Sequence, residues 1–352
     1  TVIENIEADA TGNLTVPIST VYCGAEVTSS TIIEGFTIIS GKGSGGLGTQ
    51  ACMFVLGDPE IRKTLFEGRE KTDAGRYMTG VHLYTSDAVI SDNVFDIKWN
   101  YDGSSGERSF GVYIDTSSPT ITRNHIDPGE GTYTYGIYMF VASSPAPFIY
   151  NNVILSGEGT NNVGSYGIWN QNNDSKIYNN TIIGGNVAGS HCIHIKSGAP
   201  FLENNILYFA TSSYVNTFAI YEDATTADPS SLSSNTLYSY GGGMYYDYGE
   251  TTPTVTNLTT TVTLSADSQT LGYWGNVGDD PEFADTGSGG YHLDSLSPSS
   301  IYEGGIDGSS LGADWGFETD GIGNSIDKDD LPRSGDALNE YGWSMGAYEY
   351  DN

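Results

Sequence analysis

The sequence predicts an all-β solenoid, in which short parallel strands stack coil upon coil and no helices are needed. Three columns of residues predict it: one of rings, one of aliphatic side chains and one rich in asparagine, each recurring about every 28 residues up to about residue 250. Self-similarity at a period of about 20–50 residues is typical of stacked units that share a core. We expect about nine coils, which at about 4.8 Å per coil would span roughly 43 Å.

The first column consists of flat rings between apolar neighbours, in texts such as GVYI, GIYM, GIWN and CIHI. Alternation with a period of two residues is typical of strands. The aliphatic residue before each ring must face the core, so we expect the rings to point outward from the first sheet. The column comprises Tyr22, Phe54, His82, Tyr113, Tyr138, Trp169, His194, Tyr221 and Tyr245.

The other two columns fall later in each coil, in texts such as ITRNHI, IYNNVI and LENNIL. An aliphatic residue opens each text, and an asparagine follows three positions later in most coils. Asparagine tolerates unusual backbone angles, so we expect it at a bend between two strands. Stacked asparagines can also bond to the coils above and below. This column comprises Phe36, Thr64, Asn93, Asn124, Asn152, Asn180, Asn205 and Asn235.

These Ile-x-x-Asn-x-Ile units resemble the right-handed parallel β-helix of the pectate-lyase-like superfamily over about residues 15–250. The resemblance implies a single-stranded right-handed β-helix with three sheets over residues 1–250, followed by an irregular capping segment over 251–352. In that superfamily the outer face of the first sheet forms a saccharide cleft, walled by loops. The corresponding loops here are expected at 96–110, 127–135, 155–166 and 208–218.

Outward rings in such a cleft predict a surface that binds polysaccharide or a surface glycan, because flat rings stack on sugar faces. The sequence leaves a second interpretation open, in which the rings stack on one another beneath loop tyrosines such as Tyr133, Tyr135 and Tyr166. The residues expected to contact a glycan are Tyr113, Tyr138, Trp169, His194, Tyr221 and Tyr245.

A polysaccharide lyase or a glycoside hydrolase would use the same cleft, and the sequence leaves catalysis open. Lyases of this superfamily need a base, for which the resemblance offers Lys196 and His194, together with His191 and Arg108. Asp223 and Asp247 are expected one coil apart on the outer face, and carboxylates about 5 Å apart suit a retaining glycosidase or a cation site. The pectate lyase Trp-x-Asp-His signature and the polygalacturonase set are absent. A structural surface or adhesion protein is the third interpretation.

Charge excludes several classes of partner. Lys and Arg number 13 against 44 Asp and Glu, a net charge of −31, which disfavours nucleic acid and anionic membranes. No apolar run reaches the roughly 18 residues of a membrane span. Oxygen-rich clusters can bind calcium, although a solvated acidic loop is the alternative interpretation. The calcium candidates are Asp279, Asp280, Asp327 and Asp329.

The last hundred residues carry a second resemblance. The texts DDPEFAD, GGYHLDSLSPSSIYEGG, IDKDDLPR and WSMGAYEY are similar to the closing segment of many bacterial secreted or surface β-helix proteins, with Ser344 where aspartate is usual. The resemblance implies a secreted or cell-surface protein. We expect Trp343, Tyr348 and Tyr350 to cover the open end of the last coil, the capping that a solenoid requires.

Overall fold

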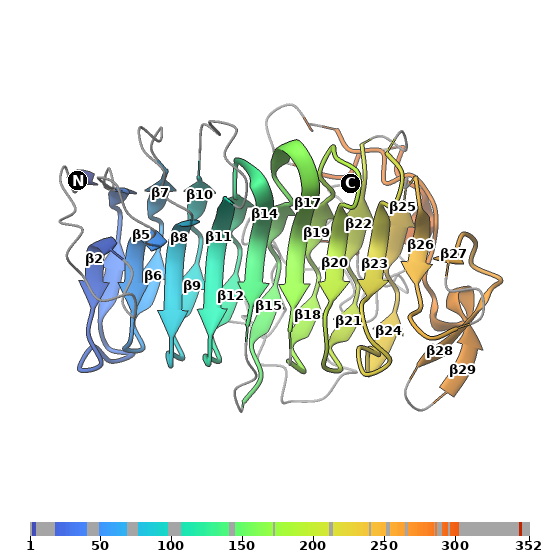
Figure 1. The fold of residues 1–352 in the computed structure, drawn as a ribbon, viewed down its shortest axis with the longest axis horizontal. Coiled ribbons are helices and arrows are strands. Elements are labelled where there is room, and N and C mark those ends of the chain that lie inside the picture. The colour runs from blue at the N-terminus through green and yellow to red at the C-terminus, as the bar shows by residue number, and fades with distance from the viewer. Residues whose placement is uncertain are drawn as a thin grey trace, which may run out of the picture.

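The computed structural model describes residues 2–4, 18–40, 49–68, 77–97, 107–140, 145–171, 173–210, 214–238, 241–250, 254–264, 267–284, 286, 291–294, 296–302 and 345–346. Over these residues the chain winds into a parallel β-solenoid (Figure 1). The helices among them are the 3₁₀ turn η1 (Leu271–Trp274) and the short α1 (Ser299–Tyr302). The predicted all-β fold class is therefore confirmed.

The first sheet carries the predicted rings and is built from the longest strands. Its neighbours pair in parallel, one coil to the next, as far as β26, which pairs antiparallel with β27 (Thr254–Val255). The parallel strands are β2 (Ile18–Cys23), β5 (Thr49–Val55), β8 (Tyr77–Tyr84), β11 (Arg108–Asp115), β14 (Glu130–Met139), β17 (Glu158–Asn170), β20 (His191–Ile195), β23 (Phe218–Glu222) and β26 (Gly243–Tyr246).

The second sheet contains three-residue strands whose middle residue belongs to the aliphatic column. From Ile61 onward these residues are at most 1% exposed, so the column forms one wall of the core. Its strands are β3 (Ile32–Glu34), β6 (Glu60–Arg62), β9 (Val89–Ser91), β12 (Thr120–Thr122), β15 (Phe148–Tyr150), β18 (Lys176–Tyr178), β21 (Phe201–Glu203) and β24 (Ser231–Ser233).

The third sheet also contains three-residue strands, and the middle residue of each one from β4 onward is fully buried. Its strands are β1 (Val2–Glu4), β4 (Thr37–Ile39), β7 (Leu65–Glu67), β10 (Val94–Asp96), β13 (His125–Asp127), β16 (Val153–Leu155), β19 (Thr181–Ile183), β22 (Ile206–Tyr208) and β25 (Thr236–Tyr238). The three inner faces enclose a single apolar core that runs along the solenoid.

The solenoid makes about seven turns, whereas the sequence predicted nine coils. Among the described residues the second sheet has eight strands, so eight coils contain a strand of every sheet and seven steps join the first of them to the last. The ninth ring-bearing strand, β26, does not start another such coil. The chain after it turns back into β27, which pairs antiparallel with β26 and ends the parallel stacking.

The asparagine column forms the predicted ladder between coils. The backbone N–H and the Nδ2 of Asn180 donate to Oδ1 of Asn205 at 3.0 and 3.1 Å, and Nδ2 also donates to the carbonyl of Ile149 at 2.9 Å. The same pattern joins Asn235 to Asn276, which lies 41 positions further along the chain. The C-terminal segment thus supplies a last rung that the sequence did not predict.

The bend between the second and third sheets is made by the residue before each ladder position, not by the ladder asparagine as expected. These residues have φ between 47° and 57°, the left-handed region that non-glycine residues rarely adopt. The ladder asparagine itself must keep its amide inside the bend, where it reaches the next coil. The non-glycine bend residues are Lys63, Asp92, Arg123, Asn151, Asn179, Asn204 and Ser234.

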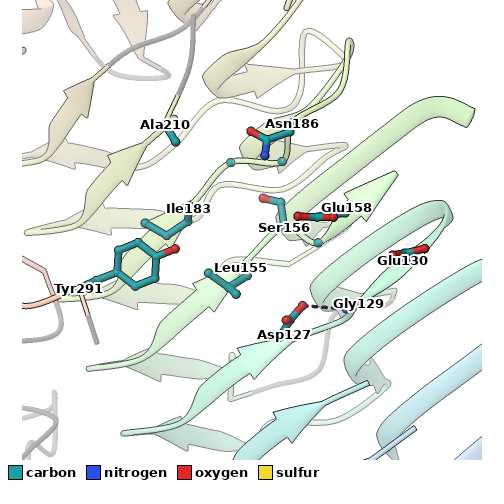
Figure 2. Close-up of a pocket in the computed structure, with 13 residues that line it drawn as sticks. Asp127, Gly129, Glu130, Leu155, Ser156, Glu158, Ile183, Asn186, Ala210 and Tyr291 are labelled. Atoms are coloured by element: carbon teal, nitrogen blue, oxygen red, sulfur yellow. Dashed lines mark hydrogen bonds between the residues drawn. The ribbon is translucent and has the colours of Figure 1, made fainter. Parts of the chain in front are cut away.

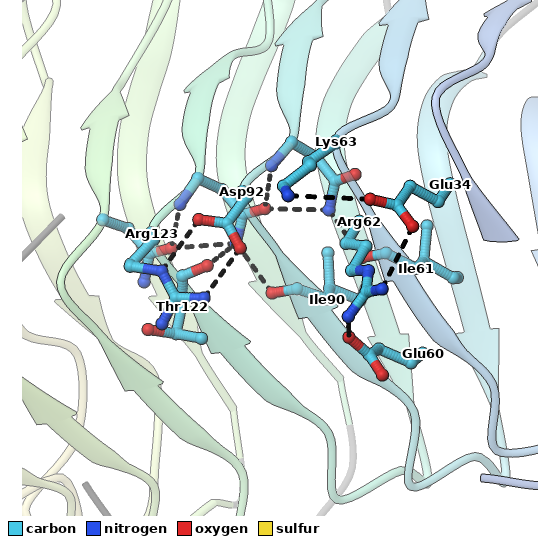
Figure 3. Close-up of polar contacts among 12 residues, drawn as sticks. Glu34, Glu60, Ile61, Arg62, Lys63, Ile90, Asp92, Thr122 and Arg123 are labelled. Atoms are coloured by element: carbon cyan, nitrogen blue, oxygen red, sulfur yellow. Dashed lines mark hydrogen bonds and ion pairs between the residues drawn. The ribbon is translucent and has the colours of Figure 1, made fainter. Parts of the chain in front are cut away.

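Charged pairs link neighbouring coils along this corner (Figure 3). The guanidinium of Arg123 donates to both carboxylate oxygens of Asp92 at 2.8 and 2.7 Å, one coil away. Arg62 donates to Glu60 on its own strand and to Glu34 in the coil before. Both arginines thus have carboxylate partners within the solenoid, and Lys63 lies 3.6 Å from Glu34 as well.

The C-terminal segment covers two parts of the solenoid. Val255 and Val262 are buried in the main core, with Leu258 and Trp274 packed against it beyond the last coil. Leu293, Ile301 and Met345 pack together with Ile206 on the outside of the third sheet. The residues expected to cap the end, Trp343, Tyr348 and Tyr350, lie outside the described residues, as do Asp327 and Asp329.

Candidate functional site

The outer face of the first sheet carries two columns of rings, where the sequence predicted one. Simple alternation would place Phe110 and Tyr113 on opposite faces of β11. Gly111 and Val112 both face the core instead: a Cβ on Gly111 would collide with buried Ile126, and Val112 is 0% exposed. Rings three positions apart therefore share the outer face. The second column comprises Phe110, Tyr135, Tyr166, His191 and Phe218.

This second column corrects part of the loop prediction. Tyr133 and Tyr135 lie in β14 and Tyr166 lies in β17, in segments that were expected to be loops. From Tyr133, which lies opposite Gly164, the two strands pair in one register, so Tyr135 lies opposite Tyr166; before Tyr133 the pairing continues after a shift of register. The signal in the sequence was the recurring text of ring, small residue, aliphatic residue and ring, as in FGVY and YGIY.

The rings of the first column stack on one another along the solenoid, which is the second interpretation that the sequence left open. Consecutive centroids lie 3.9 to 6.0 Å apart from Tyr113 to Tyr246, with interplanar angles of at most 30°. Tyr138 and His194 are only 7% and 5% exposed. Each inner ring therefore has its faces covered by its neighbours, and a sugar could reach its edge but not lie flat on it.

Tyr245 does not belong to the ring column, in contrast to the sequence prediction. Tyr245 is the register partner of core Ile220 and is 0% exposed, whereas Tyr246 pairs with Tyr221 and takes the outer position. Tyr245 donates its hydroxyl hydrogen to Glu222, another inward residue. We therefore remove Tyr245 from the residues expected to contact a glycan.

Asp247 follows the same correction. Asp247 is 4% exposed, and its carboxylate lies within 4.8 Å of those of Glu222 and Asp228 instead of pairing with Asp223 on the outer face. Burial raises the pKa of Glu222 to about 9. Among the described residues these three carboxylates form the one group close enough to share a cation, and Asp279 and Asp280 are not part of it.

The other catalytic candidates do come together. Lys196 is hydrogen-bonded to Asp223, whose Oδ2 also lies 3.7 Å from Nε2 of His194. His194 and then Lys196 lower the pKa of Asp223 to about 2. Burial lowers the pKa of His194, although Asp223 opposes the effect. An ionised carboxylate, an exposed ammonium and a buried imidazole thus meet on the outer face, beside Trp169.

A pocket of about 200 Å³ opens where the ring stack is interrupted. The ring of His82 is tilted by 84° against Phe54 and by 59° against Tyr113, so it separates the stacked pair of Tyr22 and Phe54 from the longer stack that begins at Tyr113. Both ring nitrogens of His82 are buried and have no hydrogen-bond partner among the described residues. Burial lowers the pKa of His82 to about 4, so its imidazole is neutral near pH 7. The remaining lining residues are Tyr77, Arg108, Phe110, Tyr138 and Phe140.

Arg108 is the one basic residue of this pocket. Its guanidinium carbon lies 5.5 Å from the ring centroid of Tyr77 and 5.5 Å from that of Tyr133, the residues beside it in the adjacent strands. Unlike Arg62 and Arg123, it has no carboxylate partner among the described residues. In a chain of net charge −31, a partly exposed guanidinium held between two rings is available to a ligand.

Comparison with protein-family models and with curated proteins found no match for this chain. No helix among the described residues is long and apolar enough to cross a membrane. The β-solenoid with its aromatic clusters is compatible with carbohydrate binding.

Proposed function

We propose that this protein binds polysaccharide on the outer face of the first sheet, with the Arg108 pocket anchoring one sugar residue. The observation that carries the proposal is the guanidinium of Arg108, which is held between Tyr77 and Tyr133 at an opening in the ring stack and has no carboxylate partner among the residues that the structure describes. Guanidinium groups offer five N–H donors in a fixed plane. Such a group can grip adjacent hydroxyls, or a carboxylate, of a saccharide.

The ring columns support the proposal in a different way from the one the sequence predicted. Their stacked faces are not available to sugars, but the stack makes the surface rigid, so little side-chain entropy is lost on binding. Tyrosine edges contribute hydroxyl groups. Two exposed rings add to the surface: Phe140 (38% exposed), which follows β14 and lines the pocket, and Tyr84 (44% exposed) at the end of β8. A chain of sugars would therefore run across the strands, along the solenoid.

A location outside the cell, secreted or on the surface, is part of the same proposal. It rests on the texts of the C-terminal segment, and extracellular glycans would be the partners available there. An adhesion role without glycan binding remains an outcome of the test below.

Catalysis is a second candidate function, favoured by the contact of Lys196, Asp223 and His194 on the same face. Asp223 stays ionised across the neutral range, because His194 and Lys196 lower its pKa to about 2. A retaining glycosidase built on Asp223 and Asp247 is not supported, because Asp247 lies inside the solenoid. A polysaccharide lyase, or a hydrolase of another kind, would have to use Lys196, Asp223 and His194.

The proposal is tested with a glycan array, followed by affinity measurements on the glycans retained. Arg108→Ala should weaken binding by about tenfold or more, since one charge-assisted contact accounts for about 1.4 kcal/mol or more. Arg62→Ala, which removes an arginine from the second sheet, is the matched control and should bind as the unaltered protein does. Retained glycans are then incubated with the protein, and an unsaturated product absorbing in the ultraviolet would reveal a lyase. No retained glycan, or equal losses in both variants, would contradict the proposal.

A further inference from the structure

The cavity drawn in Figure 2, of about 440 Å³, lies outside the ring columns, where third-sheet strands lead into β14 and β17. Its carboxylates, on Asp127, Glu130 and Glu158, are at least partly exposed. The Oγ of Ser156 is inaccessible and lies 3.4 Å from the place where a Cβ on Gly167 would stand, facing the core. These groups do not define the chemistry of a ligand, whereas an exposed turn at the end of the solenoid does.

This turn contains Asn257, Leu258 and Thr259, and it lies between β27 and β28 (Thr261–Leu264). Asparagine, then any residue except proline, then serine or threonine is the acceptor pattern for N-linked sugars. Four such triplets occur in the chain, and they begin at Asn13, Asn173, Asn179 and Asn257. In a chain rich in asparagine and threonine the pattern also arises by chance, so the structure has to decide which triplets can react.

Burial excludes two of the other triplets in the folded protein. Asn173 is 1% exposed, and Asn179 is 0% exposed at the left-handed bend before the ladder residue Asn180. A sugar on either side chain would have to displace the neighbouring coils. Asn13 lies outside the described residues. Among the residues that the structure describes, Asn257 is therefore the one triplet asparagine at the surface.

The hydrogen bonds of the turn leave the amide nitrogen of Asn257 available. Its Oδ1 accepts the backbone N–H of Thr259 at 3.0 Å and the hydroxyl hydrogen of Thr259 at 2.6 Å. The hydroxyl of Thr260 donates to the same oxygen at 3.1 Å. The oxygen is therefore held inside the turn. The Nδ2, on the other side of the amide carbon, has no hydrogen-bond partner among the described residues.

Leu258, the middle residue of the triplet, anchors the turn. Its side chain packs against the main core, and its carbonyl accepts the N–H of Gly272 at 2.8 Å. Asn257 and Thr259 on either side of it are exposed. β27 is the last strand of the first sheet and lies beyond β26 at the end of the solenoid (Figure 1). The turn is therefore both fixed in shape and open to a large enzyme.

We propose that Asn257 is an acceptor for an N-linked oligosaccharide. The donor is a lipid-linked oligosaccharide diphosphate. The Nδ2 of Asn257 attacks C1 of its first sugar and forms the C1–Nδ2 bond, while the bond from C1 to the phosphate oxygen breaks. The lipid diphosphate leaves, and one Nδ2 proton passes to a base of the transferase. Exported proteins meet such a transferase, so the inference rests on the proposed location outside the cell.

The modification would leave the proposed glycan-binding pocket open. Arg108 lies in β11, and five steps between paired strands separate β11 from β26. At about 4.8 Å for each step, this is a separation of about 24 Å along the sheet. The glycan array and the modification therefore report on separate parts of the molecule, and either proposal can fail without the other.

Transfer with purified components tests the proposal independently of where the protein is located. The folded protein is incubated with a lipid-linked oligosaccharide diphosphate and a single-subunit oligosaccharyltransferase that requires only the triplet. A glutamate-specific protease then releases fragment 251–282, which contains this triplet alone, and electron-transfer mass spectrometry locates the sugar. Occupancy of Asn257 should exceed that of Asn179 by about tenfold or more, because Asn179 reacts only after local opening. Synthetic peptides around the two triplets should be modified alike.

Variants separate acceptor function from a purely structural turn. Thr259→Val removes the hydroxyl that the triplet requires and should lower occupancy of Asn257 by about tenfold or more, while Thr259→Ser should keep it within about threefold. Thr260→Val removes the other hydroxyl bonded to the same oxygen and is the matched control, with a change of less than about twofold.

Thermal melts establish that each variant is folded, and the comparison of the folded protein with the peptides suffices if one is not. An unmodified Asn257 in the folded protein, while its peptide is modified, would overturn the proposal. Equal losses in Thr259→Val and Thr260→Val would also overturn it, because they would show that the turn and not the triplet decides the reaction.

Discussion

The Nδ1 atoms of His191 and His194 lie 2.9 Å apart on the outer face of the first sheet. Two nitrogens at this distance share a single hydrogen, so one imidazole donates and the other accepts. Burial lowers the pKa of both rings, most strongly for His191, and the proximity of His194 lowers that of His191 further. Both imidazoles therefore resist protonation and stay neutral in the folded protein near pH 7.

This arrangement predicts that acid destabilises the fold through its histidines. Below the unfolded-state pKa of about 6.5, the unfolded chain binds protons that His191 and His82 do not take up in the folded state, so stability falls as the pH falls. The urea midpoint measured between pH 7.5 and pH 5 should therefore depend less on pH in His191→Phe than in the unaltered protein. An unchanged slope in the variant, with an unchanged circular dichroism spectrum, would contradict the shared-proton account.

The asparagine ladder predicts a large loss of stability on substitution at one rung. Asn180→Ala removes the Nδ2 donor to the carbonyls of Ile149 and Tyr178 and the Oδ1 acceptor of the backbone N–H and the Nδ2 of Asn152, while Tyr178 keeps the N–H of Asn151. We expect a loss of about 3 kcal/mol or more in the free energy of unfolding, measured by urea titration. Asn186→Ala, at an exposed position, is the control and should change it by less than about 0.5 kcal/mol. A loss of similar size in both variants would contradict the ladder's role.

On the first sheet, the residue before the inward aliphatic residue is glycine in some coils and larger in others. The third-sheet side chain that faces this position explains the difference. A Cβ on Gly167 would collide with Cγ2 of Ile182 and also with the carbonyl oxygen of Cys192. Cys192 and Ala219 occur in coils whose third-sheet residue is Leu207 or Leu237. Gly167→Ala should therefore destabilise the protein by about 1–3 kcal/mol. Adding Ile182→Leu, which moves the branch away from the Cβ, should recover part of that loss. Additive losses in the double variant, measured by urea titration, would contradict this explanation.

The sequence predicted the features that repeat at one spacing and missed those that do not. The ring and asparagine columns were visible because each core position recurs once per coil. Tyr245 was misassigned because GMYY offers two adjacent tyrosines, and only the pairing of Tyr245 with Ile220 shows which one faces inward. Asn276 was missed because 41 residues separate it from Asn235.

The second ring column and the Arg108 pocket were missed for a different reason. Strict alternation places Phe110 and Tyr113 on opposite faces, and only the two consecutive inward residues between them bring both outward. Arg108 was considered as a base, but its place between Tyr77 and Tyr133 depends on the register of three strands. The pairing of strands between coils places the second ring column and Arg108, and that pairing cannot be read from any single segment of the sequence.

Glu222 predicts that the stability of the fold decreases as the pH rises, which is opposite in sign to the effect of the histidines. Burial raises its pKa to about 9, so its contribution to stability is complete below the unfolded value of about 4.5 and is lost as the pH rises through 9. In Glu222→Gln the amide can still accept from the N–H of Tyr248 and donate to the hydroxyl of Tyr245. The variant should be more stable at pH 8, by up to about 3 kcal/mol, and the gain should vanish near pH 4.5. Thermal melts across this range that show no gain at pH 8 would contradict it.

The central claim is that Arg108 contacts the glycan, and NMR of the arginine Nε–Hε groups tests it most directly. The protein is titrated with an oligosaccharide of the retained glycan while the resonances of Arg108, Arg62 and Arg123 are followed. We predict that the Arg108 resonance shifts with the saturation curve of binding. The resonances of Arg62, on the second sheet, and Arg123, at the bend after it, should stay in place, because both side chains are paired with carboxylates away from the first sheet. A saturable titration in which the Arg108 resonance does not move would contradict the claim.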